Sequence, residues 1–516
     1  MKFHFYLLGL GGFAAIQSCT DMDRGTGNPN IVFILADDLG YGDISFFNPE
    51  SKIRTPNIDR LAQTGVAFTD AHSGSAVSTP TRYGILTGRY SWRSEMKSGV
   101  LNGYSKALIP RERKTMADML KEVGYNTACI GKWHLGWNWN NIEKGNDSVD
   151  YSKPITEGPT GRGFDYFFGF NGSLDMPPYV YVENDKPTSL PDRVTTGNNI
   201  TYGKPGYDGS MWREGPTGSD FFHIECTPEF FRRAGNYIYE KAQEKNPYFL
   251  YLALPSPHTP ILPTEEFKGK SGVNYYADFI MMIDEEIGKL LNVIEETGES
   301  QNTIIIFTSD NGTALWADIE TLKAKGHQTS YIYRGHKADL YEGGHRVPCI
   351  VKWPAGTRKP HIVDQTVCLN DFYATLAAVT KYKIADNEAE DSYNLLPAII
   401  EKDYRKTIRE ATVHQSVNGN LAIRKGEWKL LMTPGSGGWS SPRPGKEEEG
   451  LPPVQLFNMK DDPSEQRNLQ AEHPEIVKEL TVLLKKYIDE GRSTPGVPSK
   501  NEDEFPDKLR LRELPD

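Results

Sequence analysis

Ile31-Val-Phe-Ile-Leu-Ala36 is an unbroken apolar run that leads directly into Asp37 and Asp38. Such a run is typical of a strand that is buried on both faces of a sheet. Similar runs follow at residues 127–130, 248–254, 303–308 and 347–352. Apolar residues at three- and four-residue spacing predict helices at residues 56–63, 115–122, 228–244 and 275–296. This alternation predicts an α/β fold with a doubly wound, mostly parallel sheet.

The pattern changes beyond about residue 385. Short runs at residues 421–424 and 428–431 are typical of antiparallel strands, and a helical pattern follows at residues 474–487. We therefore expect a large catalytic α/β domain at residues 28–385 and a smaller α+β subdomain with a tail at residues 386–516. The charged tail after Gly491 is expected to be a strap or a loose end.

The charge balance of the chain excludes some classes of binding partner. The chain has 516 residues, with 58 Lys and Arg against 69 Asp and Glu, so its formal net charge is −11. An acidic balance argues against a nucleic-acid partner and against a polybasic membrane patch.

The N-terminal residues predict an export signal. Residues 5–16 form an apolar run that is too short to span a bilayer but typical of a signal peptide. The next residues, Gln17-Ser18-Cys19, resemble a bacterial lipobox, which predicts a signal peptide at residues 1–18 and a lipidated Cys19. Ordinary cleavage near Ser18 is the alternative. We expect a protein of the bacterial cell envelope, in the periplasm or on the outer membrane, that meets the membrane only through its lipid anchor.

Four cysteines remain: Cys129, Cys226, Cys349 and Cys368. They form no pair with the spacing of a zinc site. Buried free thiols are expected, although one disulfide remains possible in an exported protein.

Polar residues follow four of the predicted strands; after the second and third strands they are Lys132, His134 and His258. Asp37 and Asp38 follow the first, and Asp310 and Asn311 follow the fourth. Either pair alone is often a helix cap or a turn. Because ligands of open α/β sheets bind at the carboxyl ends of the strands, the two pairs together predict an oxygen-ligand site for a hard cation such as Ca²⁺ or Mg²⁺.

The segment Ser78-Thr79-Pro80-Thr81-Arg82 predicts the start of a helix, since proline is favoured in the first turn. Ser78 would then lie near the positive end of the helix dipole, with Arg82 on the same face. A capping serine with an exposed arginine is the alternative.

These residues resemble the type I sulfatases of the alkaline phosphatase superfamily. Ser78 to Arg82 fits the family's Cys/Ser-x-Pro-x-Arg motif, and Gly124 to His134 fits its second signature. Further matches, in the family's order, are Asp37-Asp38, Pro257-His258, Ser309-Asp310-Asn311-Gly312, Lys337 and Glu342-Gly343-Gly344-His345-Arg346-Val347-Pro348. The resemblance runs from about residue 29 to 490 and implies an alkaline-phosphatase-like fold.

The resemblance implies that Ser78 is converted to formylglycine. One hydroxyl of the aldehyde hydrate would attack the sulfur of a sulfate ester, and the other would lose its proton to release sulfate. Serine at this position implies a radical-type maturase of anaerobic bacteria as a partner. An engineered replacement of cysteine is the alternative.

The resemblance also assigns roles to the other residues. Ca²⁺ would be held by Asp37, Asp38, Asp310 and Asn311 and would touch residue 78. Arg82 and His134 would hold the formylglycine, Lys132 and Lys337 would neutralise the sulfate, and His258 would protonate the leaving oxygen, with Lys337 as a possible helper.

The expected substrate is a sulfated glycan, with galactose or N-acetylgalactosamine sulfate preferred. His345, Arg346, Asp175 and Trp137 are the candidate substrate-binding residues. A core or loop histidine and aromatic packing beneath a loop are the alternatives for His345 and Trp137.

Two rival functions remain at this stage. A two-metal phosphatase needs extra Asp or His ligands, which the residues after Asn311 do not supply. A formylglycine-dependent phosphodiesterase or phosphonate hydrolase of the same fold is harder to separate. A non-catalytic glycan-binding lipoprotein with an unmodified Ser78 is the rival from another class.

Overall fold

The computed structural model describes residues 27–198 and 209–502. The predicted signal peptide at residues 1–18 and Cys19 lie outside the described residues, as does the tail from residue 503 onward. No helix in the described part of the chain is long and apolar enough to cross a membrane.

A sheet of ten strands forms the centre of the fold, with β1 (Asn30–Asp37) inside it. Its order is β13 (His361–Val363), β2 (Val66–Phe68), β12 (Cys349–Lys352), β11 (Thr303–Ser309), β1, β10 (Tyr248–Pro257), β4 (Asn126–Lys132), β5 (Tyr166–Phe170), β6 (Val182–Glu183) and β7 (Lys186–Pro187). The five strands from β11 to β5 are parallel, and β12 is antiparallel to both of its neighbours. The mostly parallel sheet and its five predicted strands are confirmed. The sequence does not predict the other five strands, because runs of two to five residues carry little periodicity.

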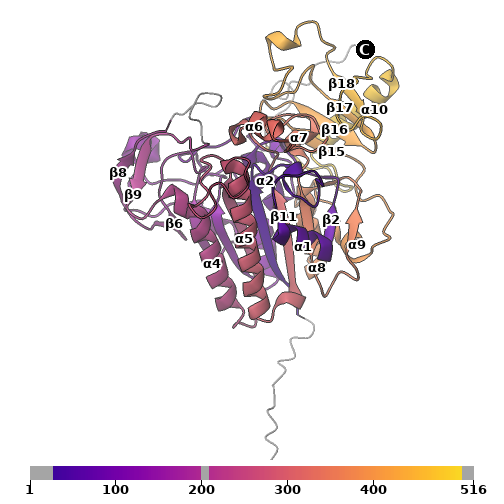
Figure 1. Ribbon diagram of the computed structural model, residues 1–516. Helices are drawn as coiled ribbons and strands as arrows, with labels where there is room; N and C mark the ends of the chain where they lie inside the picture. The colour runs from indigo at the N-terminus through magenta and orange to yellow at the C-terminus, as the bar shows by residue number, and fades with distance from the viewer. Residues whose placement is uncertain (1–26, 199–208, 503–516) are drawn as a thin grey trace, which may run out of the picture.

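Helices cover both faces of this sheet. Alternate residues of β1 enter opposite cores: Val32 and Ile34 face one, and Ile31 and Phe33 face the other. The first face is covered by α1 (Pro56–Thr64), α4 (Cys226–Lys241) and α5 (Tyr275–Glu296). The second is covered by α2 (Ser78–Thr87), α3 (Met116–Glu122), α8 (Phe372–Thr380) and α9 (Leu396–Ile400). Figure 1 shows α4 and α5 lying side by side across the near face. The four helices predicted from apolar spacing in the large domain, α1, α3, α4 and α5, are confirmed to within three residues.

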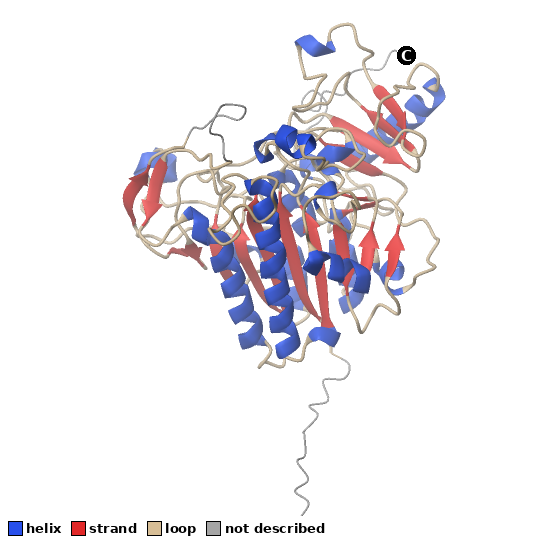
Figure 2. Cartoon of the chain, viewed as in Figure 1, coloured by secondary structure: helices blue, strands red, loops and turns tan. Residues whose placement is uncertain are grey.

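A second, smaller sheet follows in the chain. It consists of β15 (Thr412–Gln415), β16 (Leu421–Lys425), β17 (Trp428–Leu431) and β18 (Gln455–Asn458), all antiparallel, with α10 (Pro474–Asp489) packed on it. Figure 2 shows it at one corner of the large sheet. This architecture is the expected α+β unit. By packing, α9 belongs to the core of the large sheet, and the division at residue 385 stays a sequence prediction.

The remaining strands and α-helices are short. They are β3 (Ala71–His72), which pairs with β14 (Val367–Cys368), β8 (Pro191–Thr195), which pairs with β9 (Gly215–Gly218), and the helices α6 (Ile319–Ala324) and α7 (Glu342–His345). The four cysteines after Cys19 are buried and free, as expected.

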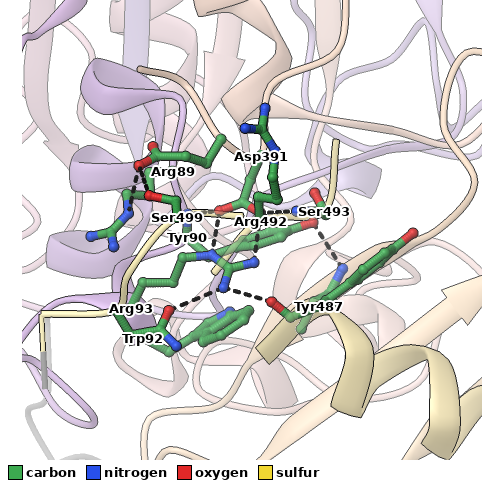
Figure 3. A network of polar contacts seen from close by, with 12 residues as sticks. Arg89, Tyr90, Trp92, Arg93, Asp391, Tyr487, Arg492, Ser493 and Ser499 are labelled. Atoms are coloured by element: carbon green, nitrogen blue, oxygen red, sulfur yellow. Dashed lines mark hydrogen bonds and ion pairs between the residues drawn. The ribbon is translucent and has the colours of Figure 1, made fainter. Parts of the chain in front are cut away.

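The chain after α10 packs as a strap as far as residue 502, and Figure 3 shows the polar network that holds it. Arg93 is fully buried, and its Nε and Nη2 donate to the two carboxylate oxygens of Asp391 at 2.8 and 2.9 Å. Its Nη1 donates to the carbonyl oxygen of Tyr487 at 2.8 Å. The backbone N–H of Ser493, in the strap, donates to Asp391 at 3.0 Å. One buried ion pair thus joins the end of α10 and the strap to the segment that follows α2.

We expect Arg93→Met to lower the free energy of unfolding by about 3–5 kcal/mol, because it leaves the buried Asp391 carboxylate without its cation. The measurement is the denaturant midpoint followed by fluorescence. Arg405→Met is the control, since Arg405 and its partner Asp403 are largely exposed and their loss should barely move the midpoint. Equal midpoints for both variants would remove the structural role assigned to the Arg93–Asp391 pair.

Candidate active site

Polar side chains gather where four neighbouring parallel strands end. β1 ends at Asp37 and β4 ends at Lys132, whereas His258 and Asp310 directly follow β10 and β11. The strands lie in the order β11, β1, β10, β4, so these side chains reach a common space. The structure therefore brings together residues that are far apart in the sequence, such as Asp38 and Asn311, which are 273 positions apart.

Three carboxylates are buried at this edge, those of Asp37, Asp38 and Asp310. Asp38 has φ 64°, a left-handed conformation that non-glycine residues rarely adopt. Its backbone N–H donates to Asp310 Oδ1 at 3.2 Å, and Asn311 Nδ2 donates to Asp38 Oδ1 at 2.7 Å. Asp38, Asp310 and Asn311, three of the four residues expected to bind a cation, thus contact one another.

Ser78 is the first residue of α2 and is buried. Its side chain does not cap the helix: Ser78 Oγ donates to Asp37 Oδ1 at 3.2 Å. Arg82, one turn later, is also fully buried, so the alternative of a capping serine with an exposed arginine is wrong. The helix start holds Ser78 beside the carboxylates, where the unpaired N–H groups favour negative charge.

Each carboxylate is paired with a buried cation. Arg82 Nη2 lies 2.9 Å from Asp310 Oδ2, and Lys132 Nζ lies 2.5 Å from Asp37 Oδ2. The third cation, Lys337, comes from the loop between α6 and α7, and its Nζ lies 2.7 Å from Asp38 Oδ1. Lys132 also approaches Ser78 Oγ at 3.4 Å. Charges of both signs therefore surround Ser78.

The carboxylates differ in how easily they ionise. Burial raises the pKa of Asp37, but Lys132, His258 and Arg82 outweigh it and hold that pKa well below its usual range. Burial and the neighbouring charge of Asp37 raise the pKa of Asp310 to about 6, despite its contact with Arg82. Asp310 thus lies where an additional positive charge would be stabilised.

The residues present fit a hard divalent cation. Besides the three carboxylates, Asn311 Oδ1 is buried and has no hydrogen-bond partner in the described part of the chain. An unpaired buried oxygen is costly, and a cation would satisfy it. Oxygen from Asp37 and Asp38 and a ring nitrogen of His258 also lie within 4.8 Å of one another. The donor set is dominated by oxygen, as Ca²⁺ and Mg²⁺ prefer.

His258 is 8% exposed, more than the carboxylates and cations of the cluster. Its Nδ1 lies 2.5 Å from the carbonyl oxygen of Thr259, so Nδ1 carries a proton and donates it there. The other nitrogen, Nε2, lies 3.6 Å from Asp38 Oδ2. Burial and the charge of Lys337 lower the pKa of the ring. Nε2 is therefore the nitrogen available for proton exchange at the site.

Asp175, expected to bind substrate, lies next to this histidine. Its Oδ1 is 4.0 Å from His258 Nδ1 and has no hydrogen-bond partner among the described residues, while its Oδ2 pairs with Arg213. Ser173 Oγ contacts both Lys132 Nζ, at 3.2 Å, and His258 Nδ1, at 3.2 Å. The sequence does not single out Ser173 or Arg213, because a lone serine or arginine in a long loop carries no pattern.

His134 lies just past β4 and is held from one side. Its Nε2 lies 2.7 Å from the carbonyl oxygen of Leu101, and its buried Nδ1 has no partner in the described chain. Burial, Lys132 and Arg82 depress its pKa well below the usual range. The ring is therefore neutral, with one nitrogen left free.

A second layer of side chains supports Asp38, and sequence reasoning missed it. The hydroxyl of Tyr276, on α5, lies 2.9 Å from the backbone oxygen of Asp38 and 2.6 Å from Asp43 Oδ2. Asp43 also accepts from Thr313 Oγ1 at 3.0 Å and contacts His327 Nε2 at 2.8 Å. This network fixes the unusual backbone of Asp38. The sequence signal was weak, since Asp43 lies only five residues beyond Asp38 and its partners lie more than 230 residues away.

The structure corrects the expectation for His345 and Arg346. His345 is fully buried, and its Nδ1 lies 3.0 Å from His72 Nδ1, in a cluster between the large and the small sheet. Arg346 pairs with Asp70 at 2.8 Å and with Glu342 at 3.0 Å. Both side chains are therefore bonded to other groups of the protein instead of facing a sugar, which supports the alternative of a core histidine for His345.

The structure also corrects the expectation for Trp137. The ring has no exposed surface and packs edge-on against Trp139 and Phe167. A sugar cannot stack on a ring that is already enclosed. Packing beneath a loop, the alternative for these aromatics, explains the tryptophan instead.

Comparison with known proteins agrees with this geometry. A family model described as Sulfatase matches residues 29–382. The N-acetylgalactosamine-6-O-sulfatase of Bacteroides thetaiotaomicron is 36% identical over 512 residues, covering 92% of this chain and 97% of that protein. The N-acetylgalactosamine-6-sulfatase of Rattus norvegicus is 26% identical over 498 residues, covering 92% of this chain and 87% of that protein.

Solved structures share the fold. One from Bacteroides thetaiotaomicron, described in connection with its metabolism of multiple glycosaminoglycans, has a TM-score of 0.78 and 36% identity, and covers 89% of this chain and 99% of its own. A phosphonate monoester hydrolase of Agrobacterium radiobacter has a TM-score of 0.56 and 18% identity, with 89% and 94% of the two chains covered, which shows a common fold alone. The alkaline-phosphatase-like fold class is thus confirmed. The match over residues 29–382 and the bacterial relative show that this chain belongs to the sulfatase family and is a sulfuric ester hydrolase.

Proposed function

We propose that this enzyme removes the 6-O-sulfate of N-acetylgalactosamine, or of the related galactose, from a sulfated glycan. The observation that carries the proposal is the buried cluster around Ser78, in which carboxylates and cations surround one helix N-terminus. The choice of sugar is supported by the relatives, two of which are named for N-acetylgalactosamine 6-sulfate.

We propose Ca²⁺ as the bound cation, held by Asp37, Asp38, Asp310 and Asn311 and touching residue 78. Bound there, it would supply a Lewis acid and a template for one sulfate oxygen. The support is the donor chemistry described above, together with the unpaired Oδ1 of Asn311.

We propose that Ser78 is converted to formylglycine by an anaerobic radical-type maturase. The aldehyde hydrate would supply a nucleophile that, unlike serine, can release the sulfate again. The position supports the proposal, because residue 78 is within 3.4 Å of Lys132 Nζ and within 3.2 Å of Asp37 Oδ1. Arg82, one turn further along the helix, pairs with Asp310, and the unpaired Nδ1 of His134 would accept a hydrogen bond from a hydroxyl on residue 78.

The remaining side chains then have separate tasks. Lys132 and Lys337 would bind sulfate oxygens, where their charge offsets the charge that develops in the transition state. Since Nδ1 is already protonated, His258 would take up a second proton on Nε2 in the substrate complex and donate it to the leaving sugar oxygen. Asp175 stays the proposed substrate-binding residue, since its buried Oδ1 could accept from a sugar hydroxyl.

The proposed location is the bacterial cell envelope, with the chain exported and anchored through a lipid on Cys19. The support is the sequence alone: the apolar run at residues 5–16 and the lipobox-like Gln17-Ser18-Cys19.

Turnover of defined sulfated sugars tests the proposal most directly. We expect N-acetylgalactosamine 6-sulfate or galactose 6-sulfate to be the best substrates in a panel of monosulfated sugars, with sulfate release lost in Ser78→Ala. Phosphate diesters with the same leaving group provide the second arm. Faster turnover of the diesters would favour the phosphodiesterase alternative over the sulfatase assignment.

The mass of the peptide that contains Ser78 tests the modification. In protein from a host with the radical maturase, we expect a loss of two hydrogens at Ser78 and turnover in proportion to the modified fraction. Protein from a host without the maturase is the control and should keep the serine mass. Full turnover by unmodified protein would contradict the formylglycine proposal.

The role of His258 is tested by changing the leaving group. We expect His258→Ala to slow hydrolysis of a sugar sulfate by about 10²- to 10⁴-fold, because an alkoxide leaves poorly without a proton. An activated aryl sulfate should lose far less. His473→Ala, at an exposed histidine of the small domain, is the control. The same loss on both leaving groups would exclude His258 as the general acid.

A further inference from the structure

Three histidines lie buried at the junction of the large and small sheets, outside the active site. We call them and the charged residues around them the junction cluster: His72, His345, His414, Asp70, Glu342, Arg424 and Lys429. Asp70 directly precedes β3, and the others come from β3, α7 and the first three strands of the small sheet. Figure 1 shows α7 beside that sheet. None of the three rings has exposed surface.

The geometry of the junction cluster does not suit a metal ion. The three rings offer nitrogens within 4.8 Å of one another, which is metal-like spacing. However, His345 and His414 are stacked, with centroids 3.9 Å apart and ring planes 10° from parallel. The lone pair of an imidazole lies in its ring plane, so two stacked rings cannot direct lone pairs at one ion. The cations Lys429 and Arg424 also contact these rings, at 3.1 and 3.4 Å.

The cluster instead forms a directed chain of hydrogen bonds. Lys429 can only donate, and its Nζ lies 3.1 Å from His345 Nε2. With Nε2 accepting, His345 Nδ1 carries the proton and donates to His72 Nδ1 at 3.0 Å. His72 Nε2 then donates to Asp70 at 2.8 Å. Lys429 and Asp70 thus fix the proton positions of both rings from the two ends.

One competing contact supports this assignment. The carbonyl oxygen of Leu340 lies 3.0 Å from His345 Nε2. If Nε2 donated there, the unprotonated Nδ1 atoms of His345 and His72 would face each other at 3.0 Å. Burial and nearby positive charge depress the pKa of His345, so it does not carry both protons.

The same elements hold the segment that leads to Ser78. The carbonyl oxygen of His345 accepts from the backbone N–H of Ser73 at 2.8 Å, and His414 Nδ1 lies 3.1 Å from the carbonyl oxygen of Ser73. Further along, the backbone N–H of Ala76 donates to Gln415 at 2.8 Å. The residues between His72 and Ser78 are therefore clamped between α7 and β15.

We infer that His345 is a positioning residue: its side chain holds the ring of His72 and stacks on His414, which contacts Ser73, and it thereby fixes the segment that places residue 78 against Asp37 and Lys132. This inference rests on the proposed role of residue 78. In this role His345 does not contact the substrate but acts through the segment that leads to residue 78. The small sheet, which carries His414 and Lys429, then helps to order the active site.

The test compares variants of two buried histidines. His345→Phe keeps a flat ring against His414 but removes both ring nitrogens, whereas His345→Asn keeps a donor close to the place of Nδ1. His361→Phe is the matched control, because His361 is also buried with both nitrogens bonded, and its strand β13 is at the edge of the sheet, four places from β1.

We expect His345→Phe to lower kcat on the sulfate ester by about 10- to 100-fold with KM little changed, since small misplacements of a reacting group are that costly. His345→Asn should recover part of the loss, and His361→Phe should keep kcat when assayed well below its unfolding temperature. Rates are divided by the fraction of modified residue 78, measured by mass.

Hydrogen exchange of the peptide around residues 73–82 supplies a readout that does not depend on turnover. We expect faster exchange there in His345→Phe, and to a lesser degree in His345→Asn, but not in His361→Phe. Unchanged exchange in both His345 variants would overturn the inference, as would a rise in KM with kcat preserved. If the modified wild-type enzyme shows no turnover, that result counts against the proposed function. The positioning role of His345 is then decided by hydrogen exchange.

Discussion

The carboxylates of Asp37, Asp38 and Asp310 lie together where water does not reach them, and the arrangement of the site follows from the need to compensate their charge. Each has one buried cation within 2.9 Å, from α2, from the end of β4, or from the loop before α7. Removing the partner of a buried ion is strongly destabilising, so a change at any of these side chains is expected to lower the free energy of unfolding. The parallel sheet satisfies the constraint geometrically, because it brings the carboxyl ends of β11, β1, β10 and β4 to one edge.

The junction cluster also compensates buried carboxylates, but it uses histidines as well as cations. Asp70 and Glu342 are buried there with Arg346, Arg424 and Lys429, and neutral histidines carry the hydrogen bonds between them. It links the small sheet to the segment before Ser78, so the C-terminal unit is part of the structure that orders the active site. The family motif that begins in α7 is part of this cluster, since Glu342 pairs with Arg346, Arg424 and Lys429.

Much of the fold could be predicted because its central strands are buried on both faces and leave continuous apolar runs, and because α1, α3, α4 and α5 keep a helical period. The position of Ser78 followed from Pro80 and Arg82, and the acidic residues at the ends of β1 and β11 followed from the rule for parallel sheets. His345 was misassigned because its neighbours His72 and His414 lie 273 and 69 positions away, and a histidine in a motif carries no sign of burial. Trp137 was misassigned for a similar reason, since an aromatic residue suits a core and a sugar pocket equally well.

The central claim is that the clustered oxygens of Asp37, Asp38, Asp310 and Asn311 bind one Ca²⁺ ion. Calorimetric titration of metal-stripped protein with Ca²⁺, beside the same titration of Asp310→Asn, measures this directly. The account predicts one ion per chain and an affinity that falls at least about tenfold in the variant, since a charged ligand is lost. Absence of binding to the wild-type protein at millimolar Ca²⁺, or an equal affinity in the variant, would contradict it.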